Sequence, residues 1–130
     1  MAAKPNVLII DDDPGVRGVL EGFLEALGYA SLSAGTGVAG LAALQTKPAD
    51  AVLLDIAMPG VLGGVDTLRA IRRSWPDLPV VMVTANVDEA IAKTTLREGA
   101  FDYVTKPLIL DRLREVLAAA MALSGKVPPA

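Results

Sequence analysis

Five short apolar runs, each followed by a stretch with helical spacing, constrain the fold of this chain more than any other feature. The strongest runs are Val7–Ile10, Ala51–Leu54 and Val80–Val83, and weaker ones cover Tyr29–Ser33 and Phe101–Thr105. Uninterrupted apolar runs of this length are typical of strands buried on both faces of a parallel sheet. Five strand–helix units in succession therefore predict an α/β fold with helices on both faces of the sheet.

Helix signals lie between these runs. Asp13 and Pro14 predict the cap and the first residue of a helix that ends at Gly28. Apolar residues at helical spacing predict four more helices, over about Val38–Gln45, Val65–Trp75, Ile91–Gly99 and Leu110–Ala120. One face of the fourth predicted helix is traced by Ile91, Ala92, Thr95, Leu96 and Gly99.

The length of 130 residues corresponds to one domain. We expect the domain to cover residues 1–123 and residues 124–130 to form a frayed, linker-like tail. A flavodoxin-like, doubly wound sheet with strand order 2-1-3-4-5 is the best match for five such units. Sheets of this kind bind their ligand at the carboxyl ends of the strands, between the first and third strands.

The composition excludes several classes of site. Without cysteine or histidine, the chain has no disulfide, no thiolate metal site and no Ser-His triad. The net charge of −3 argues against direct nucleic-acid binding, and we expect Arg69, Arg72 and Arg73 to form a solvated helix face. No apolar run reaches the roughly 18 to 20 residues of a membrane span, and the N-terminus lacks a signal peptide's apolar core. We therefore expect a cytoplasmic protein.

Polar residues follow the predicted strands at the edge where a ligand is expected. The first strand is followed by Asp11–Asp13, the third by Asp55, the fourth by Thr84 and the fifth by Lys106. Carboxylates held close together repel one another unless a cation is present, and hard oxygen ligands favour Mg²⁺. A carboxylate in such a place can accept a phosphoryl group. Asp13, before a proline, is expected to act mainly as a helix cap.

Four motifs in order give the chain its resemblance to the receiver domains of two-component signalling. The resemblance runs from about Asn6 to Leu123, and its motifs are Ile9–Pro14, Leu53–Gly60, Val83–Ala85 and Gly99–Pro107. It implies that Asp55 is the phosphoacceptor and that Asp11 and Asp12 bind Mg²⁺, Asp12 directly and Asp11 mainly through water. It also implies that the backbone carbonyl of Ala57 is a third ligand and that Lys106 contacts the phosphoryl group.

The resemblance also implies a switch. Thr84 and Tyr103 match the pair that rearranges on phosphorylation and changes the surface of the fourth helix, fifth strand and fifth helix. Small Ala85 would leave room at the site, and Pro107 matches a proline that often follows a cis peptide bond. The donor would be a histidine kinase or a histidine phosphotransfer protein. The chain would catalyse only its own phosphorylation and dephosphorylation, and would act on an unidentified output partner or domain. The same surface is a candidate for homodimerisation.

One segment departs from the family pattern. The loop Val61–Asp66 is one residue longer than usual and lacks a familiar aspartate, so we expect a more mobile loop and less certain kinase docking there. Thr95, on the inner face of the fourth predicted helix, is a smaller departure.

Two other functions remain open from the sequence. Asp11 and Asp13 form the Asp-x-Asp pattern of a small, Mg²⁺-dependent haloacid-dehalogenase-like phosphatase, with Asp11 as its nucleophile, although this leaves the motif at Asp55 unexplained. A flavin-binding flavodoxin-like protein is the third reading, although three aspartates would repel the phosphate of the flavin.

Overall fold

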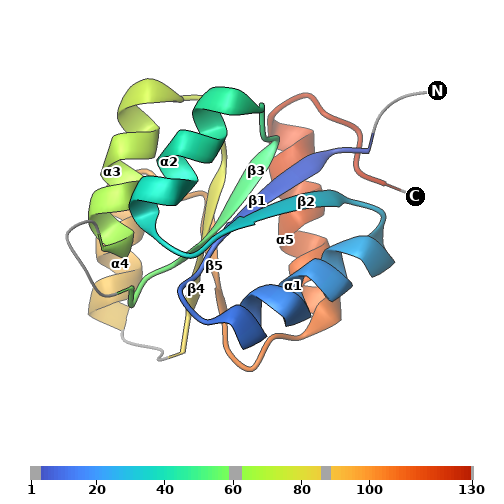
Figure 1. Cartoon of the computed structure of the whole chain (residues 1–130), viewed down its shortest axis with the longest axis horizontal. Coiled ribbons are helices and arrows are strands. Elements are labelled where there is room, and N and C mark those ends of the chain that lie inside the picture. Colours follow the sequence, from blue (N-terminus) through green and yellow to red (C-terminus); the bar gives the residue numbers. More distant parts are fainter. Residues whose placement is uncertain (1–3, 59–62, 86–88, 130) are drawn as a thin grey trace.

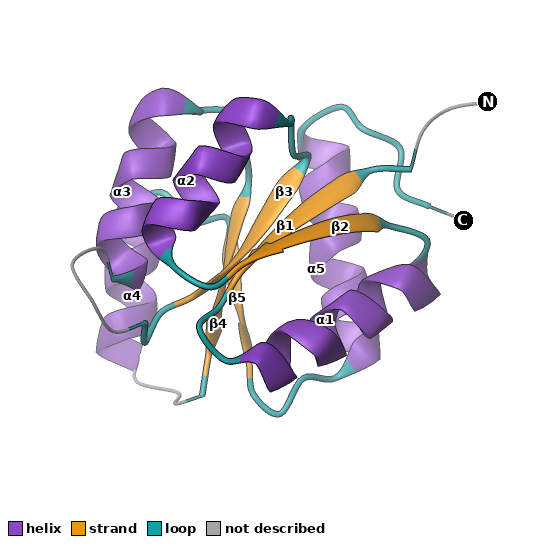
Figure 2. Cartoon of the chain, viewed as in Figure 1, coloured by secondary structure: helices purple, strands orange, loops and turns teal. Residues whose placement is uncertain are grey.

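The computed structural model describes residues 4–58, 63–85 and 89–129. Within them, strands and helices alternate along the whole chain (Figures 1 and 2). The strands are β1 (Asn6–Ile10), β2 (Ala30–Ala34), β3 (Ala51–Asp55), β4 (Val80–Thr84) and β5 (Asp102–Thr105). The helices are α1 (Pro14–Leu27), α2 (Gly37–Thr46), α3 (Gly64–Ser74), α4 (Glu89–Arg97) and α5 (Leu110–Leu123). The prediction of five strand–helix units is confirmed.

The strands form one parallel sheet in the order β2-β1-β3-β4-β5, which confirms the predicted topology. Helices α1 and α5 cover one face, and α2, α3 and α4 cover the other (Figure 2). No helix in the described ranges is long and apolar enough to cross a membrane.

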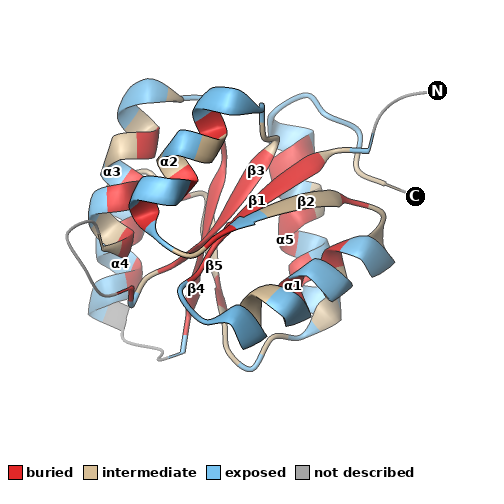
Figure 3. Ribbon diagram, viewed as in Figure 1, coloured by how far each residue is buried: buried red, intermediate tan, exposed pale blue. Residues whose placement is uncertain are grey.

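The sheet is buried on both faces, and alternate residues of each strand serve two separate cores. Along β1, Val7 and Ile9 pack with α1 and α5, whereas Leu8 and Ile10 pack with the helices of the opposite face. The central strands β1, β3 and β4 are buried along their whole length (Figure 3). This explains why their sequences are uninterrupted apolar runs rather than alternating patterns.

Helix α1 begins and ends where the sequence predicts. The carboxylate oxygen Oδ1 of Asp13 accepts hydrogen bonds from the N–H groups of Gly15, at 2.8 Å, and Val16, at 3.4 Å. Gly28 ends the helix with φ of 92°, a conformation that glycine adopts without steric cost. The interpretation of Asp13 as a helix cap is confirmed.

Helix α4 differs from its prediction in the face that it buries. Ala92 and Thr95 are buried, but Ile91 and Leu96 are 40 % and 43 % exposed. The hydroxyl of Thr95 donates to the main-chain oxygen of Ala92 at 2.9 Å, which satisfies its polar group inside the protein. The face of α4 that packs against the sheet is therefore narrower than the apolar pattern indicated.

The segment after α5 also differs from expectation. Instead of fraying, it turns at Gly125 and returns toward the start of β1 (Figure 1). The ammonium of Lys126 lies 3.1 Å from a carboxylate oxygen of Asp50, and its main-chain N–H donates to the oxygen of Met121. A glycine with φ of 72° allows this turn, and the acidic partner holds it.

Three of the remaining predictions concern α3 and the loop before it. Residues 59–62 lie outside the described ranges, and with them part of the predicted Val61–Asp66 loop; its last three residues belong to α3. Trp75, the last residue of the third predicted helix, caps α3 and packs against the core. Arg69 and Arg73 are exposed, but Arg72 is half-buried and donates to the main-chain oxygen of Leu78, so the solvated face is smaller than expected.

Candidate functional site

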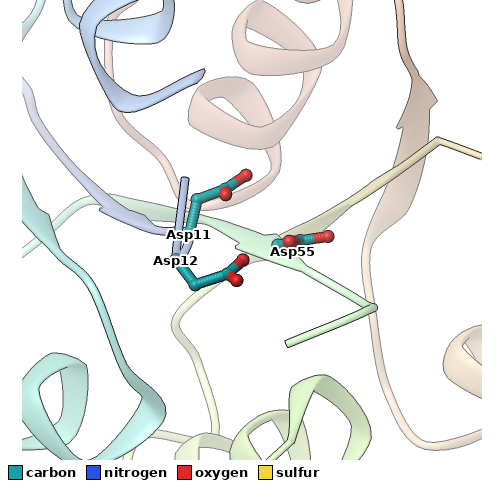
Figure 4. A group of neighbouring side chains, drawn as sticks. All are labelled: Asp11, Asp12 and Asp55. Atoms are coloured by element: carbon teal, nitrogen blue, oxygen red, sulfur yellow. The ribbon is translucent and has the colours of Figure 1, made fainter. Parts of the chain in front are cut away.

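The carboxylates of Asp11, Asp12 and Asp55 meet at the carboxyl edge of the sheet (Figure 4). One oxygen from each lies within 4.8 Å of the others. Asp11 is 1 % and Asp55 4 % exposed, whereas Asp12 lies open to solvent. The cluster is thus buried on one side and accessible on the other.

The strand register explains this meeting. Ile10 of β1 is paired with Leu54 of β3, so the residues that follow them, Asp11 and Asp55, lie side by side at the ends of these strands. This is the point at which the strand order reverses, because β2 lies on one side of β1 and β3 on the other. Open α/β sheets bind their ligands at such a point.

Asp11 is positioned by hydrogen bonds at its main chain and at one of its two carboxylate oxygens. Its main-chain N–H donates to the oxygen of Ala34 at 3.1 Å, and its Oδ1 accepts from the N–H of Asp13 at 2.9 Å. Its Oδ2 is buried and accepts no hydrogen bond from the described residues. A buried carboxylate oxygen without a hydrogen bond is costly, so this atom is suited to a ligand or a cation.

Lys106, which follows β5, brings a positive charge to the cluster. Its Nζ lies 3.4 Å from Oδ2 of Asp11 and 3.8 Å from Oδ1 of Asp55, and its side chain is 22 % exposed. These are ion pairs rather than hydrogen bonds, so the ammonium offsets part of the negative charge and leaves oxygen lone pairs available. The main-chain N–H of Lys106 donates to the oxygen of Thr84 at 2.8 Å, which fixes the position of Lys106 beside β4.

Burial raises the pKa of the Asp55 carboxyl, and the nearby carboxylates of Asp11 and Asp12 raise it further. A hydrogen bond from the N–H of Ala57 to Oδ1, at 3.2 Å, and the charge of Lys106 lower the same pKa but do not cancel the effect of burial. The ionised form of Asp55 is therefore less favoured than that of an aspartate in water, and added positive charge would favour it.

The donor set fits a small divalent cation. Three carboxylates supply hard oxygen ligands, and the open side at Asp12 leaves space for water. Mg²⁺ prefers such oxygens and retains several of its waters. Histidine and cysteine, which most other metal sites use, are absent from the sequence.

The other predicted residues lie around this cluster. Thr84 is buried at the end of β4, and exposed Ala85 follows it. Tyr103 of β5 is paired with Met82 and packs, half-buried, against the core below α2 and α3. Since Thr84 is two residues beyond Met82, Thr84 and Tyr103 face the same side of the sheet. The peptide bond between Lys106 and Pro107 is cis.

One contact to the cluster was missed by the sequence analysis. Arg17, in the first turns of α1, donates from Nη1 to the main-chain oxygen of Asp11 at 2.8 Å. Because the acceptor is a main-chain atom, the types of the two residues do not predict this hydrogen bond. The only signal is a cation one turn after the cap at Asp13.

Comparisons with known proteins agree with the fold. Residues 7–118 match the family described as the response regulator receiver domain. The chain is 37 % identical over 113 residues to the C4-dicarboxylate transport transcriptional regulatory protein DctD of Rhizobium meliloti, covering 87 % of this chain and 24 % of that protein. It is 37 % identical over 115 residues to the transcriptional regulatory protein KdpE of Mycobacterium tuberculosis, covering 88 % and 50 %.

A solved structure gives the same result. The receiver domain of NtrX from Brucella abortus superposes with a TM-score of 0.86 at 32 % identity, covering 89 % of this chain and 98 % of that one. The chain thus spans a quarter to a half of the curated relatives described above but nearly all of an isolated receiver domain. None of these matches supports the phosphatase reading.

Proposed function

The chain belongs to the response regulator receiver domain family and is a signalling switch of two-component systems, and from this premise we propose that Asp55 accepts the phosphoryl group with Mg²⁺ bound beside it. The observation that carries the proposal is a buried carboxylate that lies close to both an acidic pair and a lysine. Oδ1 of Asp55 lies 3.8 Å from Nζ of Lys106, and an oxygen of Asp55 lies within 4.8 Å of an oxygen of Asp11 and of Asp12.

In the proposed reaction, a carboxylate oxygen of Asp55 attacks the phosphorus of a phosphohistidine. A phosphorus–oxygen bond forms, the phosphorus–nitrogen bond breaks, and the histidine nitrogen keeps the electron pair and takes up a proton. The histidine belongs to a histidine kinase or a histidine phosphotransfer protein, and the 130 residues of this sequence contain none. Dephosphorylation is the attack of water on the same phosphorus, which breaks the phosphorus–oxygen bond to Asp55, releases inorganic phosphate and restores the carboxylate.

We assign the cation to Asp11, Asp12, Asp55 and the main-chain carbonyl of Ala57. Bound Mg²⁺ supplies positive charge for the oxygens of the transferring group. Oδ2 of Asp11, which accepts no hydrogen bond from the described residues, and the open side of Asp12 support this assignment. Both residues also hold the negative charge that draws a cation to the edge of the sheet.

Lys106 and Thr84 are proposed to contact the phosphoryl oxygens, the first with its ammonium and the second with its hydroxyl. A fixed positive charge placed where negative charge accumulates favours the transition state of the transfer. The position of Lys106 between Asp11 and Asp55 supports this role, and Ala85 next to Thr84 adds little bulk.

Signal output is proposed to follow from a population shift. The active arrangement exists before phosphorylation, and contacts from Thr84 and Lys106 to the phosphoryl group favour it. Tyr103, on the same side of the sheet as Thr84, turns inward, and the surface of α4, β5 and α5 changes. We propose that this surface binds the output partner or a second copy, that residues 1–123 form the domain, and that it acts in the cytoplasm.

Intact mass after incubation with acetyl phosphate tests the chemistry. We expect one phosphoryl adduct on the wild type with Mg²⁺, none without Mg²⁺, and none on Asp55→Asn. Asp77→Asn is the matched control, because Asp77 is an exposed carboxylate at the opposite edge of the sheet. An adduct that persists on Asp55→Asn would refute the assignment of the phosphoacceptor.

A further inference from the structure

Arg17 of α1 has a single side-chain partner within the described residues. Its Nη1 donates to the main-chain oxygen of Asp11 at 2.8 Å, and it forms no ion pair in that part of the chain. Arginine commonly binds carboxylates, and Arg17 is half-buried and lies against the main chain of an acidic segment. Here the guanidinium contacts the backbone of the acidic segment, which suggests a role in holding that segment in place.

The carbonyl that Arg17 binds belongs to the peptide between Asp11 and Asp12. Because the peptide unit is planar, a hydrogen bond to this oxygen fixes the plane from which the Cα of Asp12 extends. The other side of Asp11 is held by Ala34 and Asp13. Arg17 therefore completes the set of contacts that orient Asp11.

Asp12 depends on this peptide more than Asp11 does. Its side chain is exposed, and its carboxylate has no hydrogen bond or ion pair with any described residue. Its direction is then set mainly by the backbone that precedes it. Any freedom of the Asp11–Asp12 peptide would scatter the Asp12 oxygens and raise the entropic cost of gathering them around a cation.

We propose that Arg17 is a positioning residue for the cation site: by binding the main-chain oxygen of Asp11, it holds the carboxylates of Asp11 and Asp12 in place and raises the affinity for Mg²⁺. The inference rests on the proposed function. Residues that contact metal ligands commonly raise the affinity for the metal, because they fix the orientation of the groups that bind it.

The loop after β2 is shaped to admit the guanidinium. A Cβ added to Gly35 would lie 3.2 Å from Nη1 and 3.8 Å from Cζ of Arg17. An alanine at this position would be closer than ordinary van der Waals contact, so the guanidinium would have to shift by a few tenths of an ångström while its charge stays in the protein. Gly35→Ala therefore tests the contact between Arg17 and Asp11 without replacing Arg17.

Charge and positioning predict opposite effects of removing Arg17. A positive charge near the carboxylates repels a cation, so by charge alone its removal would strengthen Mg²⁺ binding. If Arg17 acts by positioning, its removal weakens binding. Arg17→Lys separates the two further, because lysine keeps the charge but lacks the planar fork of arginine.

The experiment is a titration with MgCl₂, followed by backbone amide shifts, of wild type, Arg17→Gln, Arg17→Lys and Gly35→Ala. Arg73→Gln, which removes an exposed positive charge from α3, is the control. We expect about tenfold weaker binding for both Arg17 variants, a smaller loss for Gly35→Ala and no change for the control. At saturating Mg²⁺, the rate of modification by acetyl phosphate should return close to that of wild type, since the contact acts on binding.

Equal or tighter Mg²⁺ binding by Arg17→Gln would overturn the inference and leave the proposed function intact. Absence of Mg²⁺ binding by the wild type would refute both together. If Arg17→Gln does not fold, Gly35→Ala decides: weaker binding supports positioning, and unchanged binding overturns it.

Discussion

Replacing Asp55 by asparagine should make the metal-free domain more stable. At an effective dielectric constant of about 20, each carboxylate at the 4.8 Å limit of the cluster repels Asp55 by about 3.5 kcal/mol. Lys106, at 3.8 Å, attracts it by about 4.4 kcal/mol. Exposure of Asp12 reduces its share by about half. Net repulsion of about 1 kcal/mol remains by this reasoning, and the burial of Asp55 adds to it.

We therefore expect Asp55→Asn to raise the free energy of unfolding by about 1 to 3 kcal/mol, which corresponds to roughly 3 to 10 °C in Tm. The Oδ1 of asparagine can still accept from the N–H of Ala57, so this hydrogen bond need not be lost. Urea unfolding in the presence of a chelator measures the difference, and Asp77→Asn controls for the loss of a surface charge. Excess Mg²⁺ should reduce or reverse the gain, because it stabilises the wild type more.

The pH dependence of this difference has a definite sign. The pKa of Asp55 is raised in the folded state, so the folded protein binds this proton more readily than the unfolded chain does. The advantage of Asp55→Asn should be full above the raised pKa, diminish as pH falls, and vanish below the ordinary value of 3.8. A variant that is less stable than wild type at neutral pH without Mg²⁺ would refute the electrostatic reasoning.

Four further substitutions test separate parts of the structure. Gly64→Ala should lower the free energy of unfolding by about 2 kcal/mol or more, because its Cβ would lie 2.5 Å from the main-chain oxygen of Ile56. Gly18→Ala, an exposed helix position with no atom within 4 Å, should raise it by about 0.5 to 1 kcal/mol in the same urea titration. Lys106→Met should slow modification by acetyl phosphate by roughly 100-fold or more, yet bind Mg²⁺ more tightly; weaker Mg²⁺ binding would contradict the charge assigned to this residue. Asp13→Ala should lower the stability by about 1 kcal/mol with unchanged Mg²⁺ affinity, because Asp13 caps α1 and donates only its main-chain N–H to the cluster.

The sequence was sufficient to predict the sheet and the acidic edge. Apolar runs that end in polar residues indicate both the strands and their carboxyl ends, and parallel pairing then brings Asp11, Asp55 and Lys106 to one edge. A helix between two successive strands returns the chain to the same edge of the sheet, so the strands are parallel. The alternation of strands and helices is therefore enough to predict their common direction.

Other features were beyond sequence reasoning for physical reasons. The apolar pattern of α4 indicates a helix but not how much of its width contacts the sheet, so Ile91 and Leu96 were grouped with the buried residues. The contact of Arg17 with Asp11 involves a main-chain oxygen, which every residue type possesses. The returning tail forms an ion pair between Lys126 and Asp50, which are far apart in the sequence.

The most direct test of the central claim is to locate the phosphoryl group on the chain. An acyl phosphate is reduced by borohydride to an alcohol, so a phosphorylated aspartate becomes homoserine and can be identified by peptide mass spectrometry. After treatment with acetyl phosphate and Mg²⁺, we expect homoserine at position 55 and unchanged aspartate at positions 11 and 12. Homoserine at position 11, with Asp55 unmodified, would contradict the account and favour Asp11 as the nucleophile.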